Sequence, residues 1–248
     1  MIWLRSFFAS LVFLLITVVF STLAIVASFF NGATEWERRV IQLWGRLTCR
    51  LFGVQVKVSG MQNWPHDRGA VILFNHTSFF DIFAMVGYLP DMRFGAKKEL
   101  FKIPFFGPAM RRVGVLPIDR ASRDHVYQVY ERSTERLKSG KKITLAPEGM
   151  RTEFPLEIQK FKAGPFLFAL QAEVDLVPVV VHGAFDVMKK NQVIPQTKKW
   201  KSEILLSVLP PVKTKGFTFH HRAELQLTVK EQMQTELNKL ITLSTSSH

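Results

Sequence analysis

A histidine and an aspartate five residues apart are the side chains of this sequence best suited to proton transfer. The segment VILFNHTSFFD places His76 one residue beyond an apolar run and Asp81 at the start of a predicted helix. Ser78 is a typical N-cap residue, which puts Asp81 in the first turn and lets its carboxylate reach back toward His76. In such a pair the aspartate orients the imidazole and stabilises its protonated form, while the other ring nitrogen takes a proton from a hydroxyl.

The same two residues also have a purely structural interpretation. Histidine and aspartate are both common near helix starts, where they cap backbone groups. On one continuous helix, five residues turn by about 500° and leave the two side chains on different faces. The catalytic interpretation therefore requires a strand-to-helix turn, and the pair taken alone favours the structural one.

Three further blocks follow this pair in the order of a known enzyme family. They are GVLPIDR at residues 114–120, PEGMRT at 147–152 and VPV at 177–179. With NHTSFFD, they make residues 75–181 resemble the 1-acylglycerol-3-phosphate (lysophosphatidic acid) acyltransferase family, whose signature is H-x-x-x-x-D. The resemblance implies that His76 is the general base and Asp81 its partner.

The resemblance also implies a site for the phosphate of the acyl acceptor. Its members are Arg120 and, within PEGMRT, Glu148, Gly149 and Arg151. A phosphate monoester carries about two negative charges near neutral pH, and a planar guanidinium binds it through two hydrogen bonds. We expect Lys97 to add to this positive field.

Two residues of PEGMRT have alternative roles. Glu148 is either a structural acceptor for backbone amides or an orienter of an arginine. Gly149 permits a tight turn, whose amides would help to hold an oxyanion or a phosphate. Ala146 and Met150 stand where the family commonly has Phe before the PEG and Thr after it. These departures concern the fine specificity for the acceptor more than the chemistry.

The implied chemistry needs no cofactor. Acyl transfer from a thioester to a hydroxyl requires a base, donors for the oxyanion and an anchor for the acceptor, but neither a metal nor a protein nucleophile. The chain lacks G-x-G-x-x-G, G-x-x-x-x-G-K-[ST], H-E-x-x-H and G-x-S-x-G, which argues against dinucleotide, P-loop, zinc-protease and α/β-hydrolase chemistry. The single cysteine, Cys49, excludes an intrachain disulfide and a cysteine-based zinc site.

Strands and helices that alternate after residue 65 must position these side chains. The predicted strands are residues 54–58, 70–74, 92–96, 113–118, 142–146, 176–182 and 203–209. The predicted helices are residues 79–88, 123–138, 164–173 and 222–241. This alternation predicts an α/β fold with a mixed, largely parallel sheet flanked by helices. The apolar stretch FKIPFFG at 101–107 is predicted to be a loop that walls an acyl groove, lies on a membrane or fills the core.

The N-terminal region has the composition of a membrane anchor. Residues 6–34 carry no formal charge, and residues 7–30 are nearly all apolar. About 20 helical residues cross a hydrocarbon core of roughly 30 Å. A cleaved signal peptide is the alternative, but its apolar region usually runs for only about 7 to 15 residues. Residues 40–54 are amphipathic and predict an interfacial helix, and the two helices either include a full span or form a hairpin that dips into one leaflet.

Charge indicates the orientation and the partners of the chain. One arginine precedes the apolar segment and four follow it closely, which places the following domain on the cytoplasmic side, and a bacterial inner membrane is expected. The predicted organisation is membrane helices at 1–54, an acyltransferase domain at 55–242 and a disordered tail at 243–248. The net charge of +13 suggests an anionic partner.

Three hypotheses follow for the activity. The first is transfer of an acyl chain from acyl-CoA or acyl-carrier protein to the 2-hydroxyl of a lysophosphatidate, which gives phosphatidate in the bilayer. The second is acylation of another lysolipid or of glycerol 3-phosphate. The third is a non-catalytic membrane-anchored protein that binds anionic lipid, which leaves the ordered blocks unexplained. Nucleic-acid binding is not expected, because the chain shows neither a basic recognition helix nor an aromatic stacking motif.

Overall fold

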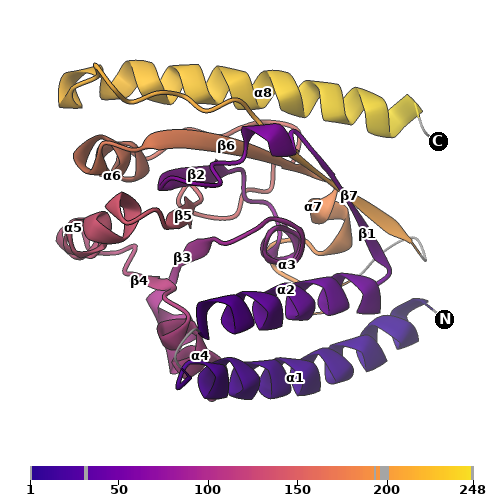
Figure 1. Cartoon of the computed structure of the whole chain (residues 1–248). Coiled ribbons are helices and arrows are strands. Elements are labelled where there is room, and N and C mark those ends of the chain that lie inside the picture. The colour runs from indigo at the N-terminus through magenta and orange to yellow at the C-terminus, as the bar shows by residue number, and fades with distance from the viewer. Residues whose placement is uncertain (1, 31–32, 193, 196–200, 247–248) are drawn as a thin grey trace. The chain divides into compact units, whose positions relative to one another are not determined.

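The parallel strands expected from the sequence are present in the computed structural model, which describes residues 2–30, 33–192, 194–195 and 201–246 (Figure 1). The chain divides into two compact units. Unit 1 comprises residues 1–56, 78–118 and 183–204, and unit 2 comprises residues 57–77, 119–182 and 205–248. Of the candidate site residues, His76 belongs to unit 2 and Asp81 to unit 1.

Parallel strands form the centre of unit 2. β2 (Ala70–Phe74) runs parallel to β5 (Lys142–Leu145) on one side and to β6 (Asp175–His182) on the other. β7 (Ser202–Val208) is antiparallel to β6, and β1 (Val54–Ser59) comes next in the strand order. Every residue of β2 and β5 is buried, as expected for strands covered on both faces. The sheet is thus mixed and largely parallel, as the sequence predicted.

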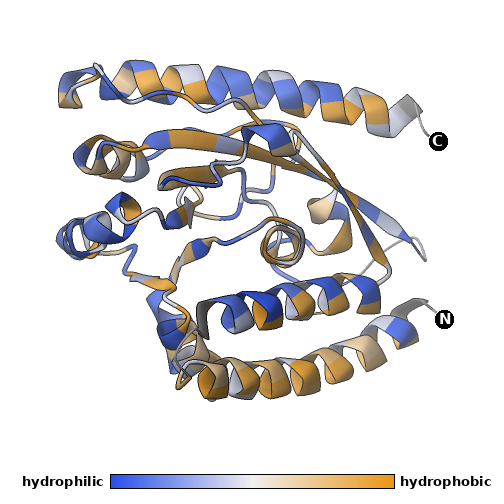
Figure 2. Cartoon of the chain, viewed as in Figure 1, coloured by the Kyte–Doolittle hydropathy of each residue, from blue (hydrophilic) through white to orange (hydrophobic). Residues whose placement is uncertain are grey.

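Helices cover the strands of unit 2. They are α5 (Arg123–Lys138), α6 (Gly164–Ala172) and α8 (Arg222–Ser246), with short 3-10 turns at η1 (Met61–Asn63) and η3 (Phe219–His221). The predicted apolar stripe of α8 is buried at Val229, Met233 and Leu237, and apolar and polar residues alternate along the helix in Figure 2. Because α8 reaches Ser246, the expectation of a disordered tail from residue 243 is wrong for residues 243–246. Residues 247 and 248 lie outside the described residues.

Unit 1 consists mainly of helices. They are α1 (Ile2–Ala27), α2 (Ala33–Leu51), α3 (Phe79–Tyr88), α4 (Phe106–Arg112) and α7 (Ala184–Val187), with η2 (Lys98–Lys102) and the parallel pair β3 (Arg93–Lys97) and β4 (Leu116–Ile118). Part of the stretch that the sequence assigned to a loop is helical in α4. β4 is shorter than predicted, because Val113 is the C-cap of α4.

Helices α1 and α2 are packed into unit 1 and do not form a separate module. The indole Nε1 of Trp44 in α2 donates to Thr17 Oγ1 of α1 at 3.1 Å. The Trp44 ring also meets the ring of Phe83 in α3, with centroids 5.2 Å apart. Next to it, Gly45 and Gly87 let α2 and α3 approach closely, because a Cβ at Gly45 would lie 2.7 Å from the Gly87 backbone nitrogen.

α1 presents two contrasting faces. One face packs on α2 and α4, where Ala24, Ala109 and Val113 form a small buried cluster. The other face exposes large apolar side chains such as Leu14 and Leu15, and α1 is apolar along most of its length in Figure 2. Within the described residues, α1 is the helix whose length and composition would allow it to cross a membrane, over residues 4–27.

We predict that Gly45→Ala lowers the thermal stability of the chain. The added methyl group would overlap the α3 backbone, and overpacking of this kind costs about 1–3 kcal/mol. Arg39→Ala, at an exposed position of the same helix, is the control and should change stability by less than about 0.5 kcal/mol. Thermal melts of the two purified variants compare them, and an unchanged melting temperature in Gly45→Ala would show that α2 and α3 do not need this close approach.

Candidate active site

The end of β2 is fixed by the side chain of Asn75, the residue before His76. Backbone pairing of β2 with β6 continues to Phe74, which lies opposite Val179. The Asn75 amide then extends it, because Nδ2 donates to Val181 O and Val181 N–H donates to Asn75 Oδ1, both at 2.8 Å. A buried amide with both functions engaged holds the chain in a single position. The backbone thus enters His76 with little freedom.

The peptide groups of His76 are held by the PEGMRT block. The His76 N–H donates to Glu148 Oε1 at 3.2 Å, and Thr152 N–H donates to His76 O at 2.8 Å. His76 is only 8% exposed, and Glu148 is buried as well. Of the alternatives that the sequence left open for Glu148, the structure shows the role of backbone acceptor, and the amide that it accepts from belongs to the candidate base.

PEGMRT itself is a tight turn that follows β5. Gly149 has φ +79°, a backbone region that favours glycine, and its N–H donates to Ala146 O at 3.0 Å. Lys162 N–H donates to Pro147 O at 2.7 Å and anchors the start of the turn. The tight turn predicted at Gly149 is therefore present. The Gly149 amide is engaged within the turn, however, and does not point to the role in holding an oxyanion or phosphate that the sequence suggested for it.

The two arginines expected to hold phosphate differ in burial. Arg151 follows the PEG turn and is partly buried, whereas Arg120 is exposed and follows Asp119 in the loop before α5. Burial raises the pKa of the Tyr130 hydroxyl well above its usual range, and the positive charge of Arg120 opposes this shift. The positive charge of Arg120 therefore acts on Tyr130, a residue of α5.

Asp81, in unit 1, is fully buried and lies in the first turn of α3, after the predicted N-cap Ser78. Its Oδ2 accepts from Ser78 N–H at 2.9 Å, and Ser78 Oγ accepts from Phe80 N–H at 3.2 Å, which together form a capping box. Ser78 Oγ also donates to Met188 O at 2.7 Å. A carboxylate has two oxygens and several lone pairs, so a cap made by Oδ2 is compatible with a second role for Asp81.

Lys97, the remaining candidate residue, is a surface residue of unit 1. It ends β3 in unit 1, its side chain is exposed, and Nζ lies 3.8 Å from Glu99 Oε2. An exposed ion pair of this kind contributes little to stability. The structure therefore joins His76, Glu148, Gly149 and the PEGMRT backbone by direct contacts in unit 2, and it shows Lys97 in unit 1 as a surface cation.

Asn75 and Thr152 are two site residues that the sequence argument did not single out. Both lie inside the recognised blocks, directly beside His76 and Arg151. The signal for Asn75 was a polar side chain at the end of a fully apolar strand, where a buried amide must find partners. Thr152 contributes its backbone amide, so its residue type gave no signal.

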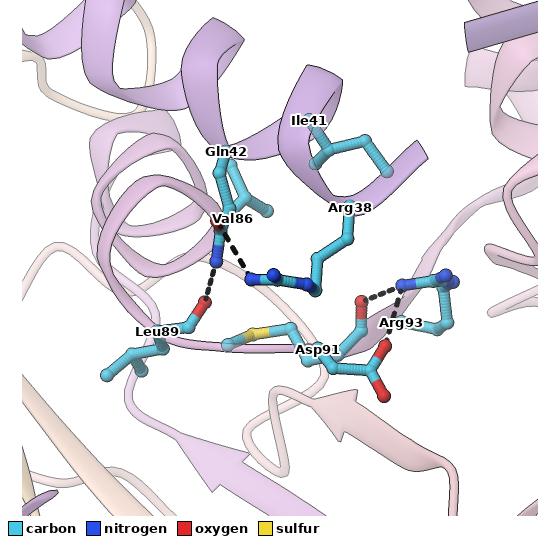
Figure 3. A pocket seen from close by; sticks show the side chains of 8 residues that line it. Arg38, Ile41, Gln42, Val86, Leu89, Asp91 and Arg93 are labelled. Carbon is cyan, nitrogen blue, oxygen red and sulfur yellow. Dashed lines mark hydrogen bonds and ion pairs between the residues drawn. The ribbon is translucent and has the colours of Figure 1, made fainter. Parts of the chain in front are cut away.

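A pocket in unit 1 is lined by charged residues that are already paired (Figure 3). It lies beside α2, the end of α3 and the start of β3. Arg38 Nη1 donates to Gln42 Oε1 at 3.1 Å, and Gln42 Nε2 donates to Leu89 O at 3.4 Å. Hydrogen bonds from Arg38 and Arg39 lower the pKa of Glu35 to about 2. This network braces α2 against the end of α3.

No candidate metal centre is present in the part of the chain that the structure describes. There, no group of three or more His, Cys, Asp or Glu side chains is arranged to hold a metal ion. The candidate site is thus a histidine at a strand end, whose peptide groups are fixed by a buried carboxylate and by a turn amide.

Comparison with known proteins places the chain in a family. The family model described as Acyltransferase matches residues 55–182, slightly more than half of the chain. The 1-acyl-sn-glycerol-3-phosphate acyltransferase alpha of Mus musculus is 28% identical over 224 residues, which cover 89% of this chain and 76% of that protein. The 1-acyl-sn-glycerol-3-phosphate acyltransferase of Helicobacter pylori is 26% identical over 188 residues, which cover 75% of this chain and 77% of that protein.

The chloroplastic acyltransferase LPAT1 of Arabidopsis thaliana is a longer protein, and it is 30% identical over 155 residues. That match covers 62% of this chain but only 43% of the plant protein. The crystal structure of the 1-acyl-sn-glycerophosphate (LPA) acyltransferase PlsC from Thermotoga maritima superposes with a TM-score of 0.82 at 26% identity, covering 97% of this chain and 98% of that one. The residues around His76, the fold and these matches together show that the chain belongs to the acyltransferase family.

Proposed function

We propose that this acyltransferase moves a fatty acyl chain from a thioester, acyl-CoA or acyl-carrier protein, to the 2-hydroxyl of 1-acylglycerol 3-phosphate. The product is phosphatidate. The observation that carries the proposal is His76, held at the end of β2 by the PEGMRT turn through Glu148 and Thr152. The names of the relatives, which are acyltransferases for 1-acylglycerol 3-phosphate, support this acceptor.

The reaction needs one side chain that first accepts a proton from the acceptor hydroxyl and then donates it to the leaving group. The His76 imidazole takes the proton of the 2-hydroxyl as its oxygen attacks the thioester carbonyl, and the tetrahedral intermediate then expels the thiolate. The imidazolium returns the proton to the departing sulfur, so the enzyme ends the cycle unchanged. Asp81, by its second oxygen, orients the imidazole and stabilises its charged form. Arg120 and Arg151 hold the acceptor phosphate, and Lys97 contributes to the positive field around it.

Because the backbone at His76 is fixed, a histidine that acts as a general base is sufficient for the reaction. No covalent acyl-enzyme intermediate is then needed. Holding the base and the hydroxyl in a reactive geometry lowers the entropic part of the barrier, and small displacements cost large factors in rate. Asn75 anchors the residue before His76 to β6, and Glu148 accepts from the His76 N–H itself. Rotation of the imidazole about its own side-chain bonds is then the main freedom left to the base.

Membrane attachment of the enzyme follows from α1. Contacts within unit 1 hold both ends of this region: Arg5 Nη2 lies 3.5 Å from Phe52 O, and the ring centroid of Phe29, just beyond α1, lies 4.5 Å from the Arg112 guanidinium carbon. A helix packed along one side and apolar along the other favours the arrangement that lies in the plane of one leaflet. The arginines that follow α1 favour the cytoplasmic side of the membrane, and the membrane that we propose is a bacterial inner membrane.

The acceptor could also be another lysolipid or glycerol 3-phosphate. Met150, which replaces the Thr common in the family, has an exposed side chain directly after Gly149, and this favours a change in the acceptor pocket. Purified enzyme offered lysophosphatidate, other lysophospholipids and glycerol 3-phosphate in parallel separates these acceptors. Preference for lysophosphatidate by less than about tenfold would contradict the proposed acceptor.

We predict that His76→Ala lowers turnover by about 10² to 10⁴, the usual contribution of a general base. Asp81→Asn should also cause a large fall, because the imidazolium loses its charge partner. The assay is thiol release from acyl-CoA with and without lysophosphatidate, and His66→Ala, an exposed histidine of unit 2, is the control. Retention of more than about a tenth of the activity by His76→Ala would contradict its role as the base.

For Glu148→Ala we predict a fall in kcat with little change in the KM for lysophosphatidate. The substitution leaves the buried His76 N–H without its acceptor, which costs about 1–3 kcal/mol and lets the base move. Glu148→Gln retains an acceptor oxygen and should recover part of the loss, whereas Glu157→Ala, an exposed carboxylate of the same loop, should behave as the wild type. A higher KM at unchanged kcat would instead place Glu148 on the substrate.

For Arg120→Ala and Arg151→Ala we predict selective loss of activity toward phosphorylated acceptors. A charge-assisted hydrogen bond contributes about 1.5–3 kcal/mol, which corresponds to roughly tenfold to more than a hundredfold in kcat/KM. Arg132→Ala, an exposed arginine of α5, is the control. Equal losses toward phosphorylated and phosphate-free acceptors would show that these arginines do not bind the phosphate.

A further inference from the structure

Phe105, just before α4, has a backbone conformation that side chains rarely adopt. Its φ is +61° and its ψ is −53°. Phe106 N–H donates to Pro104 O at 2.7 Å, which is the hydrogen bond of a γ-turn. The form of this turn with positive φ is rare and strained. Strain of this kind persists only where the surrounding structure imposes it, and it is concentrated at functional positions.

The strained turn sends two consecutive aromatic rings in different directions. The Phe106 ring packs against Trp44, with centroids 5.9 Å apart. The Phe105 side chain is 53% exposed, and that of Ile103 is 44% exposed. Gly107 fixes the start of α4 against η2, since a Cβ there would lie 2.2 Å from the Phe101 carbonyl oxygen. The Phe105 side chain therefore points outward from a rigid segment of the chain.

Three exposed cations belong to the same segment of the chain as these apolar side chains. Lys102, Arg111 and Arg112 are exposed, and no acidic residue occurs between residues 100 and 118. The guanidinium carbon of Arg111 lies 5.5 Å from the centroid of the Phe101 ring. We call Lys102, Ile103, Phe105, Arg111 and Arg112 the α4 patch. Exposed apolar side chains in a segment that also exposes cations and has no acidic residue match the surface of a bilayer that contains anionic lipid.

The α4 patch is continuous with the exposed apolar face of α1. The cluster of Ala24, Ala109 and Val113 joins the two helices. Arg112 lies over the ring of Phe29, which is 67% exposed just beyond the end of α1. This continuity favours a lipid surface over an acidic protein as the occupant of the patch.

We propose that the α4 patch is a second membrane contact, at which Ile103 and Phe105 insert into an anionic phospholipid bilayer. Lys102, Arg111 and Arg112 then lie at the level of the lipid phosphates. The inference rests on the membrane attachment proposed for α1 and adds to it a docking surface that senses lipid charge. It gives the apolar stretch at 101–107 a role at the bilayer surface.

A probe placed at position 105 of the full chain tests this inference. Cys49 is fully buried, and burial raises its pKa to about 12, so a thiol reagent at neutral pH labels the introduced cysteine in Phe105→Cys. The labelled protein is added to vesicles of phosphatidylcholine with or without phosphatidylglycerol, with brominated acyl chains as quenchers. Phe219→Cys, at an exposed aromatic position of unit 2 (59% exposed), is the matched control.

We expect quenching at position 105 in the anionic vesicles and little quenching at position 219. Removing the two guanidinium groups in Arg111→Gln/Arg112→Gln should weaken docking by about 25-fold, because each cation near anionic lipid contributes about fivefold. Phe105→Gly should melt at the same or a higher temperature, because glycine adopts this φ without strain. Loss of docking in that variant is then not a loss of fold.

The remaining outcomes separate this inference from the proposed function. Sedimentation of the labelled chain with vesicles, without quenching at position 105, overturns the inference and leaves the attachment through α1 intact. Failure to sediment contradicts the membrane attachment itself, and with it the inference. Equal quenching at both positions, or a probe response to acyl-carrier protein that exceeds the response to vesicles, also overturns it. Whichever of these outcomes is found, activity on short, soluble substrates should be unaffected if the chemistry is as proposed.

Discussion

The buried hydrogen bond from His76 N–H to Glu148 Oε1 is the constraint on which the candidate site depends. It links the end of β2 to the turn after β5, and Thr152 N–H closes the link by donating to His76 O. Both ends meet because β2 and β5 are parallel neighbours, with Leu73 opposite Leu145, so their carboxyl ends lie at one edge of the sheet. Asn75 ties the same point to β6. The backbone of His76, the proposed base, is therefore positioned by three strands at once.

The sequence predicted the elements that carry this site but not the contacts between them. Buried strands such as β2 are continuous apolar runs, and α3 begins with a serine N-cap and an aspartate in its first turn, so both were predictable from local rules. The partner of Glu148 was not, because it depends on which strands become neighbours and in which register. A carboxylate three residues before an arginine, as Glu148 is before Arg151, is equally suited to either of its two roles until that register is known.

Elements with mixed local signals were predicted less well. The stretch from Phe101 to Gly107 contains a proline and four apolar residues, which suit a loop, a groove or a core equally. α4 forms there because Gly107 allows close approach to η2 and because the rings of Phe106 and Trp44 pack together. The Ser/Thr-rich end of the chain has low helical propensity, yet α8 continues to Ser246. At such positions, tertiary contacts and the cooperative extension of a long helix outweigh low intrinsic propensity.

A double-mutant cycle between His76 and Glu148 tests the central claim most directly. If Glu148 acts only by holding the peptide of the base, Glu148→Ala should lower kcat/KM in the wild-type background and should have no further effect in the His76→Ala background. Thiol release from acyl-CoA with lysophosphatidate, measured to the residual level, gives both factors. Equal loss in the two backgrounds would show that Glu148 contributes independently of His76 and would contradict the claim.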